Sequence, residues 1–226
     1  MRMSELSSTT GATVPTLKFY LREQLLHAGE RTSPNQSQYD ETHVQRVRLV
    51  RALLEVGGLS VARAREVVGA VGAGTLPLSS VFGVAQRAVT VPTPLADESP
   101  APTEGDRLVA ELCAARGWRV YPNNPGLALA ARVLDTYASL GQQRLHAVLK
   151  PYAEAADLVA SADLAAVASA PDESEMTNVV VVGTVLGDAL FAGLRRIAQE
   201  AESFRRFPLP EGAPAPGSAT TTDEDC

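Results

Sequence analysis

Residues 10–26, TGATVPTLKFYLREQLL, restrict the fold more than any other stretch of the chain. Ser4 can cap a first helix that stops at Gly11, since glycine suits the tight turn after a helix. Thr13 can cap a second helix with Pro15 in its first turn, where the missing N–H costs nothing. Two helices joined by so short a turn predict a helix-turn-helix unit.

The second of these helices is predicted to be amphipathic. Its apolar positions recur at spacings of three and four, which is typical of a buried helical stripe. The predicted stripe consists of Val14, Leu17 and Leu21. The outer face is expected to carry Lys18, Tyr20 and Arg22. A chain with a formal net charge of −6 therefore has cationic and hydroxyl groups on one helix near its N-terminus.

The rest of the first 72 residues predicts a hairpin and two more helices. The segment HAGERTSPNQSQYD is rich in Gly, Pro, Ser and Asn, which favours a loop or a short β-hairpin. Asp40 can begin a third helix that ends at Gly57–Gly58, and Ser60 a fourth. The expected apolar stripe of the third helix consists of Val44, Val47, Val50 and Leu54.

Beyond residue 72 the sequence predicts a linker and then a helical region. One more short helix is expected at 77–89, and TVPTPLADESPAPTEG has the composition of a linker. We predict a winged helix-turn-helix domain at 1–72, a short helix and proline-rich linker at 73–103, an all-helical effector-binding or dimerisation domain at 104–208, and a disordered acidic tail at 209–226. The predicted fold class is all-α with a small β-wing, with a helical bundle as the C-terminal domain.

Two segments of the C-terminal region leave local alternatives. The segment RLHAVLKPYAEAADLVASADLAAVASA forms one long helix or two, depending on how Pro151 bends it. The run Val179–Val182 could form a strand in isolation, but the apolar residues from Val182 to Ile197 keep helical spacing. Gly183 and Gly187 would let another helix approach closely, and we expect packing inside the domain rather than a membrane dimer.

Composition and charge indicate a reduced cytoplasmic protein. No run of about 18 apolar residues lacks a charge, so no membrane span is expected. Cys113 and Cys226 lie far apart, so a structural disulfide between them is not expected. Residues 1–70 have nine Lys/Arg and seven acids, a net of +2, whereas the remainder has eleven and nineteen, a net of −8. A mildly basic N-terminal module suits nucleic acid better than the acidic remainder does.

Several elements of the first 70 residues occur in a characteristic order without large gaps. They are the turn Thr10–Gly11, the helix TLKFY.RE.LL, a wing closed by Tyr39–Asp40, and the segment L..GGLSV..AREV. Together they resemble the N-terminal DNA-binding domain of the MerR family of transcriptional regulators, in the Ala/Arg/Val-rich style of its actinobacterial branch. Many members carry a run like YR.Y in the wing, where this chain reads QSQY, so only the last tyrosine is kept.

The resemblance implies a homodimer that places its second helix in the major groove of promoter DNA. The residues implied for DNA contact are Thr13, Thr16, Lys18, Tyr20, Arg22, Arg31, Tyr39 and Arg46. Tyr20 would hydrogen-bond a phosphate, and Arg31 would replace charge lost from the wing. The resemblance also implies distortion of a pseudo-palindromic promoter so that contacts with RNA polymerase become aligned. From the residues alone, an ordinary solvated pair of Lys18 and Arg22 on a helix face stays open.

The C-terminal region offers candidates for binding a small organic effector. Metal-sensing members of the family use clustered cysteines, which this chain lacks, so neither a metal nor a cofactor is expected. The effector candidates are Trp118, Tyr121, Asn123 or Asn124, Tyr137 and Tyr152, of which Trp118 and Tyr121 would line an apolar pocket. The alternative is structural: Trp118 anchors the core, and the PNNPG segment turns the chain and caps the next helix. Cys113 and His146 are expected to be a small core residue and a partnered structural residue, respectively.

Other classes of function compete with an effector-responsive regulator. An enzyme is not expected, because the carboxylates Glu154, Asp157, Asp163 and Asp188 have no partner motif and the chain has no phosphate-binding glycine loop or nucleophile elbow. A DNA-binding factor without an effector, or a winged-helix scaffold that binds protein, stays open. The preferred hypothesis is a homodimeric regulator of the MerR type that binds promoter DNA.

Overall fold

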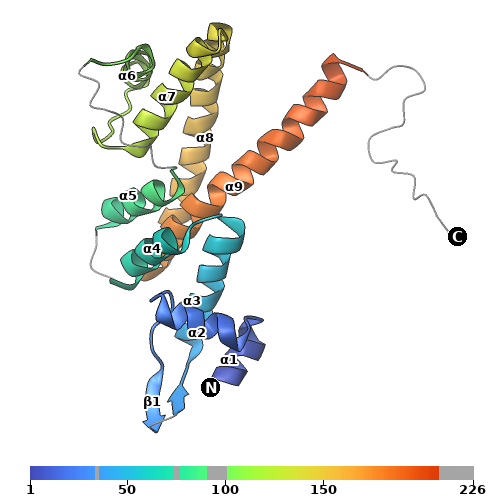
Figure 1. The fold of residues 1–226 in the computed structure, drawn as a ribbon. Coiled ribbons are helices and arrows are strands. Elements are labelled where there is room, and N and C mark those ends of the chain that lie inside the picture. Colours follow the sequence, from blue (N-terminus) through green and yellow to red (C-terminus); the bar gives the residue numbers. More distant parts are fainter. Residues whose placement is uncertain (34–35, 74–76, 91–100, 209–226) are drawn as a thin grey trace, which may run out of the picture. The chain divides into compact units, whose positions relative to one another are not determined.

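The computed structural model describes residues 1–33, 36–73, 77–90 and 101–208 (Figure 1). In these ranges the chain is predominantly α-helical and has one two-stranded antiparallel sheet, which confirms the predicted fold class. Most of the predicted linker falls at residues 91–100 and the predicted tail at 209–226, and both segments lie outside the described residues.

The N-terminal elements follow the predicted order of helices and wing. They are α1 (Met3–Thr10), α2 (Val14–Arg22), β1 (Glu30–Ser33), β2 (Gln36–Gln38), α3 (Glu41–Arg51), the π-helical turn η1 (Ala52–Val56), α4 (Val61–Ala73) and α5 (Leu78–Val89). In the wing, Glu30 pairs with Gln38, and Arg31 pairs with Ser37. The short helix expected at 77–89 is therefore confirmed as α5.

Two of the predicted helix caps are confirmed by hydrogen bonds. The Thr13 hydroxyl accepts from the backbone N–H of Thr16 at 3.2 Å, and the Asp40 carboxylate accepts from that of Thr42 at 3.0 Å. Such bonds satisfy N–H groups that have no partner inside the helix. Gly11 follows α1 with φ of 69°, a left-handed conformation that glycine adopts without strain. These local signals set the tight turn between α1 and α2.

The start of α1 differs from the prediction. Arg2 is the N-cap rather than Ser4, and its backbone N–H donates to the Glu5 carboxylate at 2.5 Å. The N-terminal ammonium of Met1 donates to the carbonyl of Tyr39 at 2.6 Å, and the Tyr39 N–H donates to the Met1 carbonyl at 2.8 Å. This pairing holds residue 1 against the end of the wing, so the helix begins directly after it.

The main hydrophobic core draws on residues from Leu6 to Val185. The predicted apolar stripe of the third helix needs a small correction where the chain continues into η1, because Leu53 is fully buried there and Leu54 is only partly buried. A step of three residues keeps Leu53 on the face of Val50, and Leu54 still packs against the same core. The stripe of α2 needs a larger correction, which is described with the candidate interface.

The C-terminal region is helical, as predicted. It contains α6 (Glu104–Arg116), α7 (Pro125–Ser139), the 3-10 turn η2 (Gln143–Val148), α8 (Leu149–Ala168) and α9 (Glu173–Arg206). Pro151 lies in the first turn of α8, where its missing N–H is harmless, so it marks a helix start and not a bend. The Val179–Val182 run is helical within α9, which confirms the interpretation from spacing.

α6 and α7 bury a second, smaller core. Its buried members are Val109, Ala131 and Leu134, and Cys113 and Tyr137 pack against them. The Nε2 atom of His146 lies 3.0 Å from the carbonyl oxygen of Leu134. The structural roles predicted for Cys113 and His146 are therefore confirmed.

The first half of α9 belongs to the main core. Val180, Val181 and Val185 are buried there, and a Cβ atom at Gly57 would collide with Val185. Glycine at the end of η1 therefore permits the close approach of α9. The chain divides into two compact units, Met1–Ala189 and the residues from Leu190 onward, and the boundary falls within α9.

α9 is also long and apolar enough to cross a membrane, judged by length and composition alone. Its most apolar window has a mean hydropathy of 1.6. Core helices of soluble proteins meet the same criterion, so one such helix is weak evidence. The expectation of no membrane span stays a prediction.

Candidate nucleic-acid interface

The candidate interface is built on α2, which directs two cations toward solvent. Lys18 and Arg22 lie four residues apart and are both exposed, and Thr13 is exposed at the start of the helix. Side chains at this spacing share one helix face, so the two cations stand one above the other. The Thr16 hydroxyl is half-buried and lies 2.8 Å from the Thr13 hydroxyl. This face combines positive charge with hydroxyl groups next to a helix N-terminus.

Arg22 is held loosely on this face. Its Nε donates to the Glu23 carboxylate at 3.3 Å, and its guanidinium carbon lies 5.3 Å from the centre of the Phe19 ring. Its side chain is nevertheless 71% exposed. An exposed ion pair contributes little free energy, so a stronger anion such as a phosphate can replace Glu23 at small cost.

The predicted outward orientation of Tyr20 is wrong. Tyr20 is 4% exposed and belongs to the main core together with Leu17. Burial is the main cause that raises the pKa of Tyr20, and the Glu55 carboxylate adds to it while Arg51 opposes it. Tyr20 follows Leu17 by three residues and therefore shares its face, whereas Val14 and Leu21, assigned to the stripe, are only partly buried.

Tyr39 and Arg46 also have structural contacts that the sequence did not predict. Tyr39 is buried, its ring meets the His43 ring edge-on at 5.1 Å, and burial raises its pKa despite a hydrogen bond with Ser37. Arg46 donates from Nη1 to the carbonyl oxygen of Val68 at 2.6 Å, and burial lowers its pKa. Both side chains stabilise the domain, so their proposed contact with DNA loses support.

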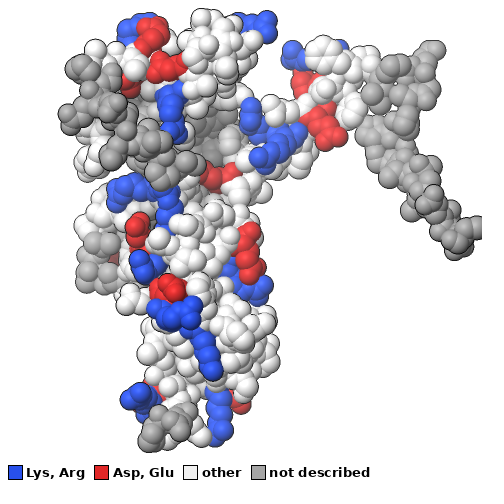
Figure 2. Space-filling view, viewed as in Figure 1, with Lys and Arg blue, Asp and Glu red and all other residues white. Residues whose placement is uncertain are grey.

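Arg31 keeps the position that the sequence predicts. It lies on β1, is exposed, and pairs through its backbone with Ser37 of β2. A cation on a two-stranded wing can reach a phosphate beside the groove that a helix occupies. On the face drawn in Figure 2, cationic and acidic side chains are interspersed among the described residues and form no continuous basic field there. Any contact with DNA therefore depends on a few placed cations.

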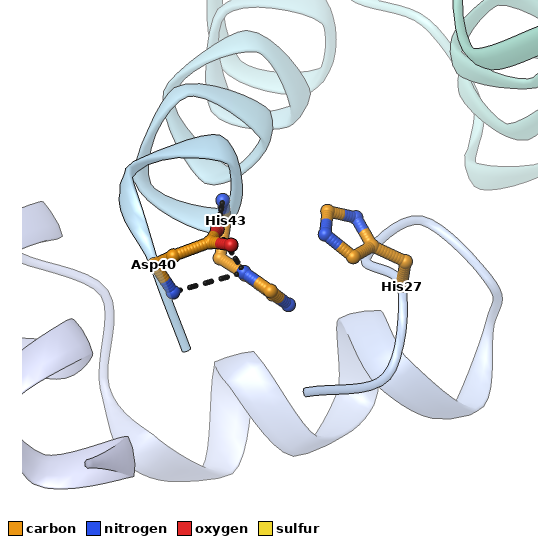
Figure 3. A group of neighbouring side chains, drawn as sticks. All are labelled: His27, Asp40 and His43. Carbon is orange, nitrogen blue, oxygen red and sulfur yellow. Dashed lines mark hydrogen bonds and ion pairs between the residues drawn. The ribbon is translucent and has the colours of Figure 1, made fainter. Parts of the chain in front are cut away.

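Next to α2, the structure brings together three side chains that the sequence analysis did not connect (Figure 3). His27 follows α2, Asp40 caps α3, and His43 lies in the first turn of α3. The two imidazole rings have centroids 3.9 Å apart, and the Asp40 Oδ1 atom lies 2.7 Å from the His43 Nδ1 atom. The wing separates His27 from the other two in sequence, so local patterns cannot show this cluster.

Comparisons with known proteins support the interpretation of the N-terminal residues as a helix-turn-helix domain. Residues 1–70 match the model of the family described as MerR HTH family regulatory proteins. The nodulation protein NolA of Bradyrhizobium elkanii is 48% identical over 56 residues, which is 25% of this chain and 26% of that protein. NolA of Bradyrhizobium sp. strain NC92 is 46% identical over 56 residues, again 25% of this chain and 24% of the relative. The match thus spans about a quarter of the length of these curated relatives.

A solved structure extends the similarity over nearly the whole chain. It is that of a candidate transcriptional regulator from Streptomyces coelicolor A3(2), with 32% sequence identity and a TM-score of 0.65. The similarity covers 93% of this chain and 99% of that one. This chain belongs to the MerR family. It is a DNA-binding transcriptional regulator, the class that both the family and the structural neighbour indicate.

In this MerR-family regulator the residues predicted to bind an effector are not gathered at one place. Tyr121 is 74% exposed and Tyr152 is also exposed, so the prediction that Tyr121 lines an apolar pocket is wrong. Tyr137 packs against the core of α6 and α7. Trp118 donates from Nε1 to the Asp157 carboxylate at 2.7 Å, which anchors it to α8. The contacts of Trp118 therefore support the alternative of a structural role rather than effector binding.

The asparagines of the regulator lie beside a hollow between α6 and α7. A hollow of about 360 Å³ is lined by Asp106, Val109, Ala110, Pro122, Asn123, Asn124, Pro125, Leu127 and Ala128. The Asn124 side chain accepts from the Gly126 N–H at 2.8 Å and so caps α7, as the structural alternative predicts. The lining includes Asn123 but none of the four aromatic candidates.

Proposed function

We propose that the protein binds promoter DNA in a sequence-specific manner as a homodimer, with α2 of each copy in the major groove. The observation that supports the proposal is that α2 has one buried face and one exposed cationic face, within a domain that matches the MerR family. Leu17 and Tyr20 hold one face in the core, while Lys18 and Arg22 extend from the opposite side into solvent. A helix fixed on one face and cationic on the other suits insertion into a groove lined by phosphates.

The roles of the individual residues follow from their chemistry. Arg22 has a planar fork of donors that fits two acceptors of guanine or of a phosphate, whereas Lys18 acts as a point charge. Thr13 and Thr16 lie at the N-terminus of α2, where hydroxyl and backbone N–H groups suit a phosphate oxygen. Arg31 on the wing would contact the backbone beside the groove. Tyr20 acts indirectly, because its buried ring orients the helix.

The homodimer is proposed to form through the second half of α9. From Gly183 onward, apolar or small residues recur every three or four positions, a heptad pattern typical of coiled coils. The positions are Gly183, Gly187, Leu190, Leu194, Ile197, Ala201 and Phe204. Leu190, Leu194 and Ile197 are 64%, 54% and 66% exposed. Large exposed apolar side chains in such a row indicate a surface that another helix covers.

The charged residues beside this apolar surface favour a second copy of α9 as its partner. The same helical segment carries acids (Glu200, Glu202) and cations (Arg196, Arg205, Arg206). A surface with both signs of charge can pair with a copy of itself, which a surface of one sign would resist. Charges within the segment also oppose its insertion into lipid.

We further propose a response to a small organic ligand, and alignment of RNA polymerase contacts through distortion of the promoter. The hollow beside Asn123 is the place where a ligand would meet polar groups on an otherwise apolar lining. A thermal-shift screen of the full chain against metabolites tests the ligand. A binder whose effect disappears in Asn123→Ala would support this site, and a consistently silent screen would favour a factor that acts without an effector.

The DNA proposal is tested by measuring affinity for a duplex taken from a genome-wide map of occupied sites. The double variant Lys18→Ala/Arg22→Ala should bind at least about 30-fold more weakly, since each lost contact is worth about 1–3 kcal/mol. The matched control is Lys150→Ala/Arg119→Ala, which removes two exposed cations of the same types from the C-terminal region.

The outcomes of this test separate the proposal from its competitors. Loss of binding in the α2 variant alone supports the groove model. Equal losses in both variants would mean that general charge attraction carries the binding. Unchanged binding in the α2 variant would favour a scaffold whose helix-turn-helix contacts protein.

A further inference from the structure

His43 presents a buried nitrogen atom without a hydrogen-bond partner. The residue is 5% exposed, and in the described part of the chain its Nε2 is the one buried side-chain polar atom that lacks a partner. A buried polar atom that loses water and gains no partner costs about 1–3 kcal/mol. Native structures rarely keep such an atom, which points to a ligand outside the protein chain.

Two groups of Asp40 meet the Nδ1 atom of His43 and call for different tautomers of the ring. The Asp40 backbone N–H lies 3.1 Å away and would donate to an Nδ1 that carries the lone pair. The Asp40 Oδ1 atom lies 2.7 Å from Nδ1, a distance that suits an N–H donating to an ionised carboxylate. Hydrogen bonds from Thr42 and His43 hold the pKa of Asp40 well below its usual range, so the carboxylate is ionised. A proton on Nδ1 leaves a lone pair on Nε2 in the neutral ring. A lone pair attracts a cation and not a further acceptor.

His27 supplies a second nitrogen at the same place. Figure 3 shows the His43 ring lying between Asp40 and His27. One ligand atom from each of the three residues can be chosen so that all lie within 4.8 Å of one another. His27 is exposed, so its ring can turn to present a nitrogen to an ion beside His43. A neutral imidazole is the form that binds metal.

We propose that His27 and His43, supported by Asp40, bind one divalent transition-metal ion of the zinc class in the DNA-binding domain. Imidazole nitrogens are common ligands of zinc and its neighbours, and water would fill the remaining positions. Asp40 uses Oδ1 to orient His43 from behind, as carboxylates do behind metal-bound histidines, and it keeps the proton on Nδ1. The negative charge of Asp40 offsets the repulsion from Arg46.

The ion would need only small movements of exposed groups. Ligand atoms bound to zinc at about 2.0–2.1 Å stand roughly 3.4 Å apart in a tetrahedral site, against the present limit of 4.8 Å. His27 is exposed and can rotate, while His43 is buried and stays in place. The expectation of no metal rested on the lack of clustered cysteines in the sequence.

The position of the site gives the ion a structural consequence. His27 lies between α2 and β1, whereas Asp40 and His43 lie just after β2. An ion bound by both histidines would therefore close the base of the wing and tie the end of α2 to the start of α3. The ion should strengthen DNA binding by fixing Arg31 and α2 relative to each other, an effect that rests on the proposed function.

The site itself is tested without DNA. Titration of the full-length protein with Co²⁺ should give the intense visible bands of low-symmetry coordination, and Zn²⁺ should displace them and bind in calorimetry with a stoichiometry near one. His27→Ala, which changes an exposed residue, should weaken Zn²⁺ binding at least about 10-fold. Asp40→Asn should also weaken it while keeping a good helix cap, because asparagine caps as well as aspartate.

Matched controls identify the ligands. His146 is the third of the three histidines in the chain, so His146→Asn should leave binding unchanged, as should Cys113→Ala/Cys226→Ala. No Co²⁺ bands with the native protein, or equal binding by native protein and His27→Ala, would overturn the proposal. A preparation that binds Zn²⁺ as expected but binds no DNA would leave the metal site standing and refute the proposed function instead.

Discussion

The two halves of α9 have similar apolar composition and opposite burial. Val180, Val181 and Val185 are buried in the main core, whereas Leu190 and Leu194 are more than half exposed. The spacing of apolar residues continues across this change without a break. Spacing therefore shows that a helix has an apolar stripe, but it does not show whether the same chain or another one covers that stripe.

α2 also has a buried part and an exposed part, but they lie on opposite sides of the helix rather than in its two halves. Leu17 and Tyr20 are buried while Lys18 and Arg22 are exposed. In α2 the exposed face is polar and suits a charged partner, whereas in the second half of α9 it is apolar and suits a helix. The exposed face of α2 and that of the second half of α9 are therefore expected to bind different kinds of partner.

The largest expected effect comes from a charge in the buried half of α9. Val181→Asp should lower the free energy of unfolding by more than about 4 kcal/mol, because an unpaired carboxylate would replace a fully buried side chain. Urea denaturation followed by circular dichroism measures the loss. A well-folded variant with nearly native stability would show that the buried half of α9 does not belong to the core.

The same substitution in the exposed half should act on assembly. Leu194→Asp should raise the dimer dissociation constant at least about 100-fold, since it places charge in the apolar seam, and should leave the helical content of each copy intact. Sedimentation equilibrium is the measurement, and Glu200→Gln is a mild control on the same helix. A native protein that is monomeric at micromolar concentration, or that binds to neutral vesicles through this segment, would refute the α9 dimer.

A smaller effect is expected where the C-terminal region anchors its one tryptophan. Trp118→Phe keeps an aromatic ring but removes the bond to Asp157, which still pairs with Arg116 at 2.6 Å. The loss should be about 1 kcal/mol because the carboxylate stays partly solvated. Thermal unfolding measures it. Unchanged stability together with a lost response to a small ligand would return Trp118 to the effector site.

The smallest effect is predicted for the hydroxyl of Tyr20. Tyr20→Phe should change DNA affinity by less than about twofold and stability by less than about 1 kcal/mol, because the ring fills the core and no phosphate contact is lost. Fluorescence anisotropy with labelled duplex tests this. A tenfold loss of affinity with native stability would restore the phosphate contact that the sequence first suggested.

The sequence predicted features that depend on local chemistry. The caps at Thr13 and Asp40, the turn at Gly11 and the place of Pro15 in the first turn of α2 follow from the conformations and hydrogen bonds of single residues. Local rules need no knowledge of the partner elements. The family resemblance of residues 1–70 rests on the same local elements in a fixed order.

The sequence did not predict features that depend on which element covers which face. Tyr20 ends in a hydroxyl group and lies two residues after Lys18. Its place in the sequence was therefore as compatible with the exposed face of the helix as with the buried face that the structure shows. Arg46 could not be assigned to the carbonyl of Val68, which lies 22 residues away. The meeting of His27 with His43 across the wing is likewise a contact between distant segments.

The salt dependence of DNA binding tests the central claim most directly. Each cation that neutralises a phosphate contributes roughly 0.9 to the slope of log affinity against log salt concentration. The account predicts that Lys18→Ala/Arg22→Ala lowers the slope by about 2 relative to the native protein, while Lys150→Ala/Arg119→Ala leaves it unchanged. Parallel salt lines for the native protein and the α2 variant would contradict the claim that this helix face lies against DNA.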